Sequence, residues 1–214
     1  MSAAVASDGR TRGSIDLREP RQRIVDATLR GIGRQGVAGL TVEAIAREAG
    51  CGRATVYRVF PGGREELLEA AALAELARFH AEVGAQLDAT DGLDELLATA
   101  LWASARFVRD SGPLTHVLTH EPTALLAHVA FDKSPAVFAV GEVLLAPRLA
   151  RHLPAERVPE VAEWLARLVL SHLALRPDAA APVDLTDRDA AAHLVTTFVL
   201  PGLDDVVAPA PARP

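Results

Sequence analysis

The chain has 214 residues, half of them hydrophobic, and a formal net charge of −6. It is long enough for one large domain or two small ones, and its few aromatics (4%) beside abundant alanine and leucine favour helices over strands. It has no uncharged apolar run of about 18 residues, no apolar secretory signal and only one cysteine, so we expect a cytoplasmic protein without a membrane span or an internal disulfide.

The charge is unevenly distributed along the chain. Residues 1–64 hold 11 arginines against six acidic residues, a balance of +5. The other 150 residues hold 11 basic and 22 acidic residues, a balance of −11. A basic N-terminal part followed by an acidic remainder is typical of a DNA-binding domain joined to a second domain, here called the body.

Residues 1–20 are polar and without periodicity, which predicts a disordered arm. Arg10, Arg12 and Arg18 could reach the DNA backbone or minor groove, as homeodomain arms do, but a terminus without a role is the simpler interpretation. Residues 21–35 follow as a predicted helix with an apolar stripe of Ile24, Ala27, Thr28 and Ile32.

Two short helices joined by a glycine-bearing turn are predicted over residues 41–60. Thr41 is suited to cap the first helix, and the apolar spacing from Val42 to Ala49 predicts about two helical turns. Gly50 and Gly52 allow a tight reversal before a second helix. Such a pair is either a helix-turn-helix, whose second helix enters the DNA major groove, or an αα-hairpin of a helical bundle.

The second short helix, residues 53–59, presents candidates for DNA contact. Arginine can donate two hydrogen bonds to guanine or neutralise phosphate, and a capping hydroxyl at a helix start can hold phosphate. Val56 and Phe60 are interpreted as core, and Cys51 as packing rather than a redox sensor. The candidates for DNA contact are Thr41, Arg53, Thr55, Tyr57 and Arg58.

The order of these residues resembles the DNA-binding domain of the tetracycline-repressor (TetR) family over about residues 21–73. The resemblance rests on Ala46, Ala49-Gly50, Thr55-Val56-Tyr57, Phe60 and Arg64-Glu65-Glu66-Leu67-Leu68. It implies a three-helix DNA-binding domain, a long linking helix and a dimer formed by the last two helices. Many relatives have Ser or Thr where this chain has Gly52, so we do not carry over that phosphate contact.

The remainder of the chain reads as a series of helices. Thr90 or Asp91 is predicted to cap the helix that follows the linking helix, and Pro147 to bend a later one. The segment after residue 207 is predicted to be disordered. The expected helices cover residues 65–87, 93–109, 114–119, 123–131, 135–152, 155–175 and 186–206.

Six residues of the body are candidates to line an effector pocket, with ordinary core packing as the alternative. His116 and His120 stand at i and i+4, a spacing that also suits a metal ion with Glu121 or His128 as a further ligand. Polar pocket lining is the preferred interpretation, so no metal site is assigned. The candidates are Trp102, Phe107, His116, His120, Phe138 and Trp164.

The last two predicted helices are more apolar than a helix with one solvent-exposed face needs to be. Either they fill the middle of the body, or they bury a face against a second subunit, as the resemblance implies. The candidate interface residues are Leu165, Leu168, His172, Leu194 and Phe198.

Together these observations predict an all-α regulator with an arm at 1–20, a helix-turn-helix domain at 21–64, an effector and dimerisation domain at 65–207 and a tail at 208–214. From the resemblance we expect a homodimer that binds a palindromic operator and is released from it by a small effector, with repression as the expected sense. The apolar composition suggests that the effector is apolar or amphipathic. The alternative is a helical ligand-binding or scaffold protein whose helix-turn-helix does not read DNA specifically. No phosphate loop, zinc-protease or nucleophile motif occurs, so we expect no enzyme and no cofactor.

Overall fold

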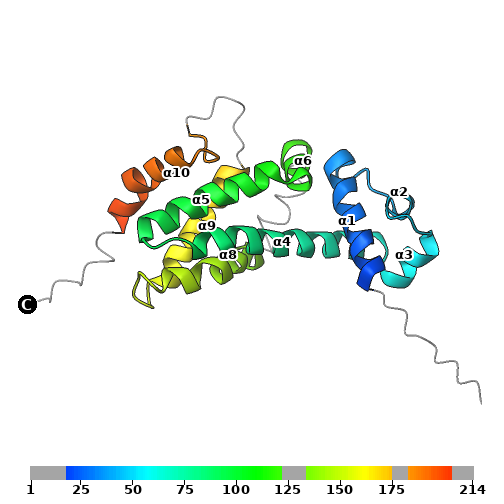
Figure 1. Cartoon of the computed structure of the whole chain (residues 1–214), viewed down its shortest axis with the longest axis horizontal. Helices are drawn as coiled ribbons and strands as arrows, with labels where there is room; N and C mark the ends of the chain where they lie inside the picture. The colour runs from blue at the N-terminus through cyan, green and yellow to red at the C-terminus, as the bar shows by residue number, and fades with distance from the viewer. Residues whose placement is uncertain (1–17, 122–133, 175–182, 204–214) are drawn as a thin grey trace, which may run out of the picture.

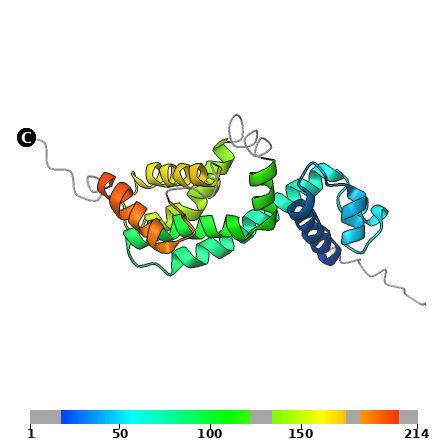
Figure 2. The same cartoon turned by 90° about the horizontal axis from the view of Figure 1, so that it is seen from above.

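A computed structural model describes residues 18–121, 134–174 and 183–203, and within these ranges all regular secondary structure is helical. Helices α1 to α3 form one end of an elongated molecule, and α5 to α10 form the other (Figures 1 and 2). The predicted all-α class is confirmed. The predicted helix at 123–131 lies outside the described residues. None of the described helices is long and apolar enough to span a membrane.

The N-terminal end consists of α1 (Arg18–Gln35), α2 (Val42–Glu48) and α3 (Arg53–Val59). Helix α1 begins three residues earlier than predicted, because proline is tolerated in the first helical turn, where its missing N–H would have no helical acceptor. The three helices surround a core of fully buried apolar side chains, which include Ile24, Ile45, Val56, Phe60 and Leu67.

Helix α4 (Arg64–Asp88) runs from this core into the body (Figure 1). Its first turns place Leu67 and Ala71 in the N-terminal core. Its last turns place Val83 and Leu87 in the core of the body. One continuous helix therefore contributes to both cores.

The body is built around α5 (Leu93–Asp110), which packs against α4, α9 and α10. The prediction that Thr90 or Asp91 caps α5 is wrong, because Gly92 occupies the cap position. The Thr90 hydroxyl instead donates to the carbonyl of Leu87 at 2.8 Å and so closes the end of α4. The other body helices are α6 (Gly112–His120), α8 (Ser134–Leu149), which includes Pro147, and α9 (Val158–Ala174).

The final helix is shorter and less regular than predicted. Helix α10 covers Arg188–Leu194, and a π-helical segment (Val195–Val199) and a 3₁₀ turn (Leu200–Gly202) continue it. Asp187 caps its start, accepting from the backbone N–H of Asp189 at 2.8 Å. Pro201 has no N–H to donate to the preceding turn and its ring crowds that turn, which accounts for the loss of α-helical geometry there.

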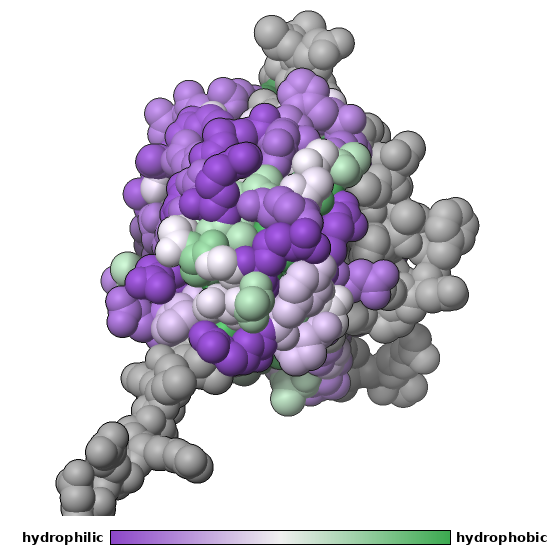
Figure 3. All heavy atoms as spheres, turned by 90° about the vertical axis from the view of Figure 1, so that its right-hand side faces the viewer, coloured by the Kyte–Doolittle hydropathy of each residue, from purple (hydrophilic) through white to green (hydrophobic). Residues whose placement is uncertain are grey.

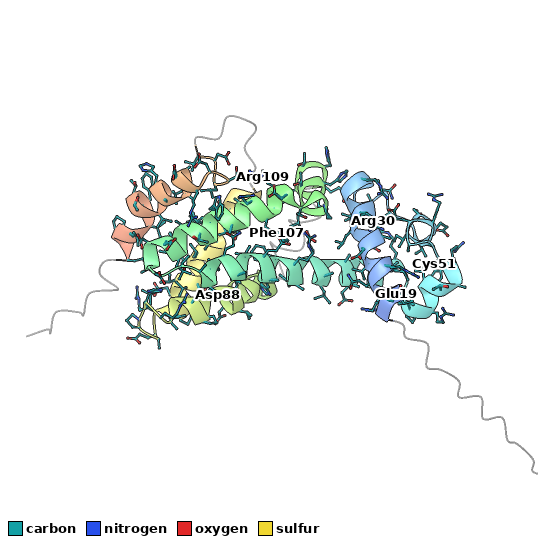
Figure 4. The ribbon with its side chains drawn as sticks, in the orientation of Figure 1. Glu19, Arg30, Cys51, Asp88, Phe107 and Arg109 are labelled. Carbon is teal, nitrogen blue, oxygen red and sulfur yellow. The ribbon has the colours of Figure 1, made fainter. Side chains whose placement is uncertain are left out.

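Arg148 fastens α8 to the end of α4. Its guanidinium makes two bonds of 2.9 Å to the carboxylate of Asp88 and also donates to the carbonyls of Gly84 and Leu144. The Arg148 side chain is largely buried, at 16% exposed, whereas the Asp88 side chain is 63% exposed and open to solvent. The hydrogen bonds from Arg148 lower the pKa of Asp88, which Figure 4 labels at the far end of α4.

Replacing Arg148 with alanine should lower the free energy of unfolding by about 1–3 kcal/mol, because it leaves the Gly84 and Leu144 carbonyls without this donor. Chemical denaturation followed by circular dichroism measures the change. Arg47→Ala, at an exposed position of α2, is the matched control and should change stability by less than about 0.5 kcal/mol. Equal effects of the two substitutions would contradict the fastening role of Arg148.

Candidate nucleic-acid interface

The turn between α2 and α3 has the geometry that a helix-turn-helix requires. The Thr41 hydroxyl accepts from the N–H of Ala44 at 3.2 Å, so the predicted cap is confirmed. At the other end of α2, the N–H of Gly50 donates to Arg47 O and that of Cys51 to Ala46 O. Gly50 has φ of +66°, the left-handed conformation that this pair of bonds demands and glycine adopts without strain. Figure 4 labels Cys51 in this turn.

Helix α3 has a clearly buried face and a clearly exposed one. Val56 and, just after the helix, Phe60 are fully buried in the N-terminal core, as predicted. Arg53, Tyr57 and Arg58 are exposed. The two sets therefore separate the packing side of α3 from the side that is open to a partner.

The two other candidates for DNA contact differ in exposure. Thr41 is exposed at the start of α2, whereas Thr55 is half-buried. Gly52, at the cap of α3, provides no side-chain hydrogen bond to the helix start. The end of the molecule that carries these helices is mainly hydrophilic, with a few apolar side chains among the polar ones (Figure 3).

Arg53 forms an ion pair with Glu43 in the first turn of α2, with 2.9 Å between Arg53 Nη1 and Glu43 Oε1. Both side chains are more than half exposed. The sequence analysis did not identify Glu43. An acidic residue in the first turn is a common helix signal, but only the angle between α2 and α3 brings it to Arg53.

Glu48, at the end of α2, ties α2 to α1. It accepts from Arg30 at 2.9 Å and from Arg34 at 2.8 Å, both on α1. Hydrogen bonds from Arg30 and then Arg34 lower the pKa of Glu48 below its usual value. Figure 4 labels Arg30 on α1. This pair of contacts adds to the core packing that holds α2, and with it α3, on α1.

The predicted pocket residues whose side chains the structure describes have different surroundings. Phe107 is buried and packs edge to face against Phe79 with ring centroids 5.3 Å apart (Figure 4). Trp102 is half-buried and lies beneath the guanidinium groups of Arg106 and Arg188. Trp164 is 44% exposed on α9. Phe138 belongs to α8, but its side chain lies outside the described residues.

His116 and His120 lie with ring centroids 4.7 Å apart on α6, the body helix that packs against α1. Glu121 is engaged by the backbone N–H groups of Val37 and Ala38. Across the described ranges, no three His, Cys, Asp or Glu side chains are grouped so as to hold a metal ion. His128 lies outside those ranges.

The candidate interface residues differ in exposure. Leu165 is wholly buried in the subunit's own core, so the prediction that it faces a partner is wrong for this residue. Leu168 and Leu194 are half-buried, and Phe198 is 73% exposed on the π-helical segment. His172 lies on α9, with its side chain outside the described set.

Comparison with known families finds a match at the N-terminal end of the chain. Residues 24–71 match the family described as "Bacterial regulatory proteins, tetR family", a match that runs from α1 into the first turns of α4. An uncharacterized HTH-type transcriptional regulator of Pseudomonas putida, TtgW, is 46% identical over 55 residues. That alignment covers 26% of this chain and 40% of TtgW, so the chain spans well under half the length of this curated relative.

Solved structures resemble the chain along most of its length. The TetR family repressor AlkX from Dietzia sp. has a TM-score of 0.60 at 24% identity, covering 88% of this chain and 97% of AlkX. The multidrug binding protein EbrR, solved in complex with imidazole, has a TM-score of 0.58 at 22% identity, covering 94% of this chain and 98% of EbrR. At these identities the likeness establishes the fold.

Replacing Glu48 with glutamine should destabilise the protein in a pH-dependent way. A lowered pKa in the folded state means that the stabilisation by Glu48 is fully present above the unfolded pKa of about 4.3 and is lost as pH falls through the folded pKa. The wild type should therefore melt at a higher temperature than Glu48→Gln at pH 7, and the difference should shrink toward pH 3. Thermal melts at half-unit pH intervals test this, and a constant difference would contradict it.

Proposed function

We propose that this chain, whose residues 24–71 match the tetR family of bacterial regulatory proteins, is a sequence-specific transcriptional regulator that binds operator DNA through α3. Repression, released by a small effector bound in the body, is the proposed sense. The proposal assigns no catalytic role and places the protein in the cytoplasm, associated with the nucleoid when bound to DNA. The observation that carries it is the division of α3 between a face buried in the core and a face that presents Arg53, Tyr57 and Arg58.

The exposed face of α3 supports a division of roles among these residues. Arg53 and Arg58 are suited to guanine edges or phosphates, and Tyr57 to phosphate. Thr41, exposed at the start of α2, is placed for a phosphate contact, and Thr55 for a smaller contribution, since it is half-buried. The excess of arginine in residues 1–64 supports an electrostatic contribution that does not depend on sequence.

Exposed apolar side chains on the body support a homodimer. Val143 of α8, Trp164 of α9 and Phe198 of the π-helical segment are all large, apolar and exposed in the single chain. Burial of such side chains against a second subunit is favourable because it removes apolar surface from water. Two copies of α3 would then fit a palindromic operator with half-sites about 34–36 Å apart.

An apolar or amphipathic effector is proposed for the body. The core there is dominated by leucine, valine and alanine, and Phe107 with Phe79 provides aromatic surface. Such an effector would weaken DNA binding by preferring a dimer whose two α3 helices have a different separation. EbrR, which has a similar fold, is a multidrug binding protein.

The proposed function is tested by fluorescence anisotropy with DNA from upstream of the chain's own gene and its neighbours. Scrambled DNA of equal length and a salt series separate sequence preference from ionic attraction. A site preferred by a factor on the order of 10³ or more is expected of a specific regulator. Equal, weak binding to both DNAs would favour a helical ligand-binding or scaffold protein instead.

Tyr57→Ala should weaken operator binding about tenfold, or roughly 1.4 kcal/mol, by removing a contact from the exposed face of α3. Anisotropy measures the affinity, and circular dichroism and light scattering check that helix content and oligomeric state are retained. Leu73→Ala, at an exposed apolar position on α4, is the control and should bind normally. If Tyr57→Ala binds the operator as well as the wild type does, the proposed placement of α3 on the DNA is wrong.

Phe198→Asp should raise the dissociation constant of the homodimer at least tenfold, because it would bury a charge at the proposed interface. Analytical ultracentrifugation across a concentration series measures that constant. Leu73→Asp places the same charge at an exposed apolar position of α4 and should leave the dimer unchanged. A Phe198→Asp protein that dimerises as well as the control would remove this segment from the interface.

A further inference from the structure

Helix α6 is packed against the N-terminal domain along its length. It lies beside α1 in both ribbon views (Figures 1 and 2), and the two helices are in extensive contact. At its start, a Cβ added to Gly33 of α1 would stand 3.3 Å from the carbonyl carbon of Gly112, so the two backbones approach closely. In its middle, Val117 packs against the N-terminal core. The body therefore touches the DNA-binding domain through α6 as well as through α4.

The end of α6 holds the backbone of the turn that links α1 to α2. The Glu121 carboxylate accepts from the N–H of Val37 at 3.0 Å through Oε2 and from the N–H of Ala38 at 3.1 Å through Oε1. The two partners lie more than 80 residues away in the chain. One carboxylate thus satisfies two successive N–H groups of a turn that has no helical acceptor for them.

Gly36 makes this contact possible. Its φ is +75°, a left-handed conformation that other residues adopt with strain. A Cβ at this position would lie 2.1 Å from Glu121 Oε1 and 3.0 Å from His116 Nε2. The turn therefore fits beneath the end of α6 only with glycine at position 36.

Arg64 holds the same turn through its carbonyl groups. Its guanidinium donates to the carbonyl of Leu40 at 3.1 Å and to that of Val37. Arg64 is the first residue of α4, and Glu121 follows the last residue of α6. The N–H groups of the turn are therefore bound by the residue that follows α6, and its carbonyl groups are bound by the first residue of α4.

The start of α6 is anchored to the body, as its end is anchored to the turn. Ser111 caps α6, and its side-chain oxygen accepts from Leu114 N at 3.2 Å. The same hydroxyl donates to the buried carboxylate of Glu75 on α4. Glu75 also pairs with Arg78, 2.9 Å away. A displacement of α6 would therefore also displace the turn that links α1 to α2.

We propose that Glu121 is a positioning residue for DNA recognition, which fixes the orientation of the helix-turn-helix on the body by holding the Val37–Ala38 backbone. The inference rests on the proposed function, since it concerns how well the chain binds its operator. A dimer whose two α3 helices must meet two half-sites binds best when each domain has one orientation, because ordering mobile domains opposes binding. Glu121 contacts no DNA in this arrangement and acts through the turn.

The test compares the wild type with Glu121→Ala and Glu121→Gln in the full-length chain. Operator affinity should fall about tenfold in Glu121→Ala and by a smaller factor in Glu121→Gln, which keeps one carbonyl acceptor. Affinity for scrambled DNA and the slope of affinity against salt should stay at the wild-type values, because no phosphate contact is lost. Glu163→Ala, which removes an exposed acidic side chain from α9, is the matched control for charge and should bind as the wild type does.

Hydrogen exchange measures the contact independently of DNA. Amide exchange in residues 36–40 should be at least tenfold faster in Glu121→Ala, while α2 and α3 keep their wild-type protection. A merely structural role would loosen the whole domain and lower its melting temperature. Gly36→Ala should weaken operator binding less in the Glu121→Ala background than in the wild type, because the clash with Oε1 is absent there.

Three results would overturn the proposal: unchanged or higher operator affinity in Glu121→Ala, an equal loss of affinity for scrambled DNA, or unchanged exchange at residues 36–40. A wild-type chain that prefers no DNA would instead refute the proposed function. In that case hydrogen exchange still reports whether Glu121 holds the turn, so the two failures are distinguishable.

Discussion

The continuity of α4 is the constraint on which the arrangement of the molecule depends. Because its first turns are buried in the N-terminal core and its last turns pack against α5 and α8, a rotation of α4 must repack two cores at once. Packed cores resist such changes, since interiors are as dense as organic crystals. Arg148 reinforces the body end through Asp88, and Arg64 reinforces the other end through the α1–α2 turn.

The proposed DNA-binding surface is supported from behind by polar contacts as well as by packing. Glu48 joins α2 to two arginines of α1, and the Schellman-type bonds around Gly50 set the reversal into α3. These contacts lie away from the exposed face of α3. The side chains proposed to reach DNA therefore stand on a rigid support, as a recognition surface requires.

The body is organised differently from the N-terminal end. Its aromatic side chains are dispersed: Phe107 is in the core, Trp102 lies beneath two arginines, and Trp164 is at the surface. Besides Leu73 on α4, the large exposed apolar side chains of the described body lie on α8, α9 and the segment that follows α10. This distribution is what one subunit of a dimer would show, with apolar surface reserved for its partner.

The amino-acid sequence by itself determined the helical class, the Thr41 cap, the Gly50 reversal and the buried positions Val56 and Phe60, because these depend on neighbours within a few residues. Periodicity misplaced the cap of α5 and the last helix, where Pro201 alters the backbone hydrogen bonding. The apolar stripe that contains Leu165 left core and interface open, and the family resemblance favoured the interface, whereas the side chain is buried in the subunit's own core. Only the tertiary structure brought Glu43 to Arg53 and Glu121 to the α1–α2 turn, because contacts between distant segments depend on how the helices cross.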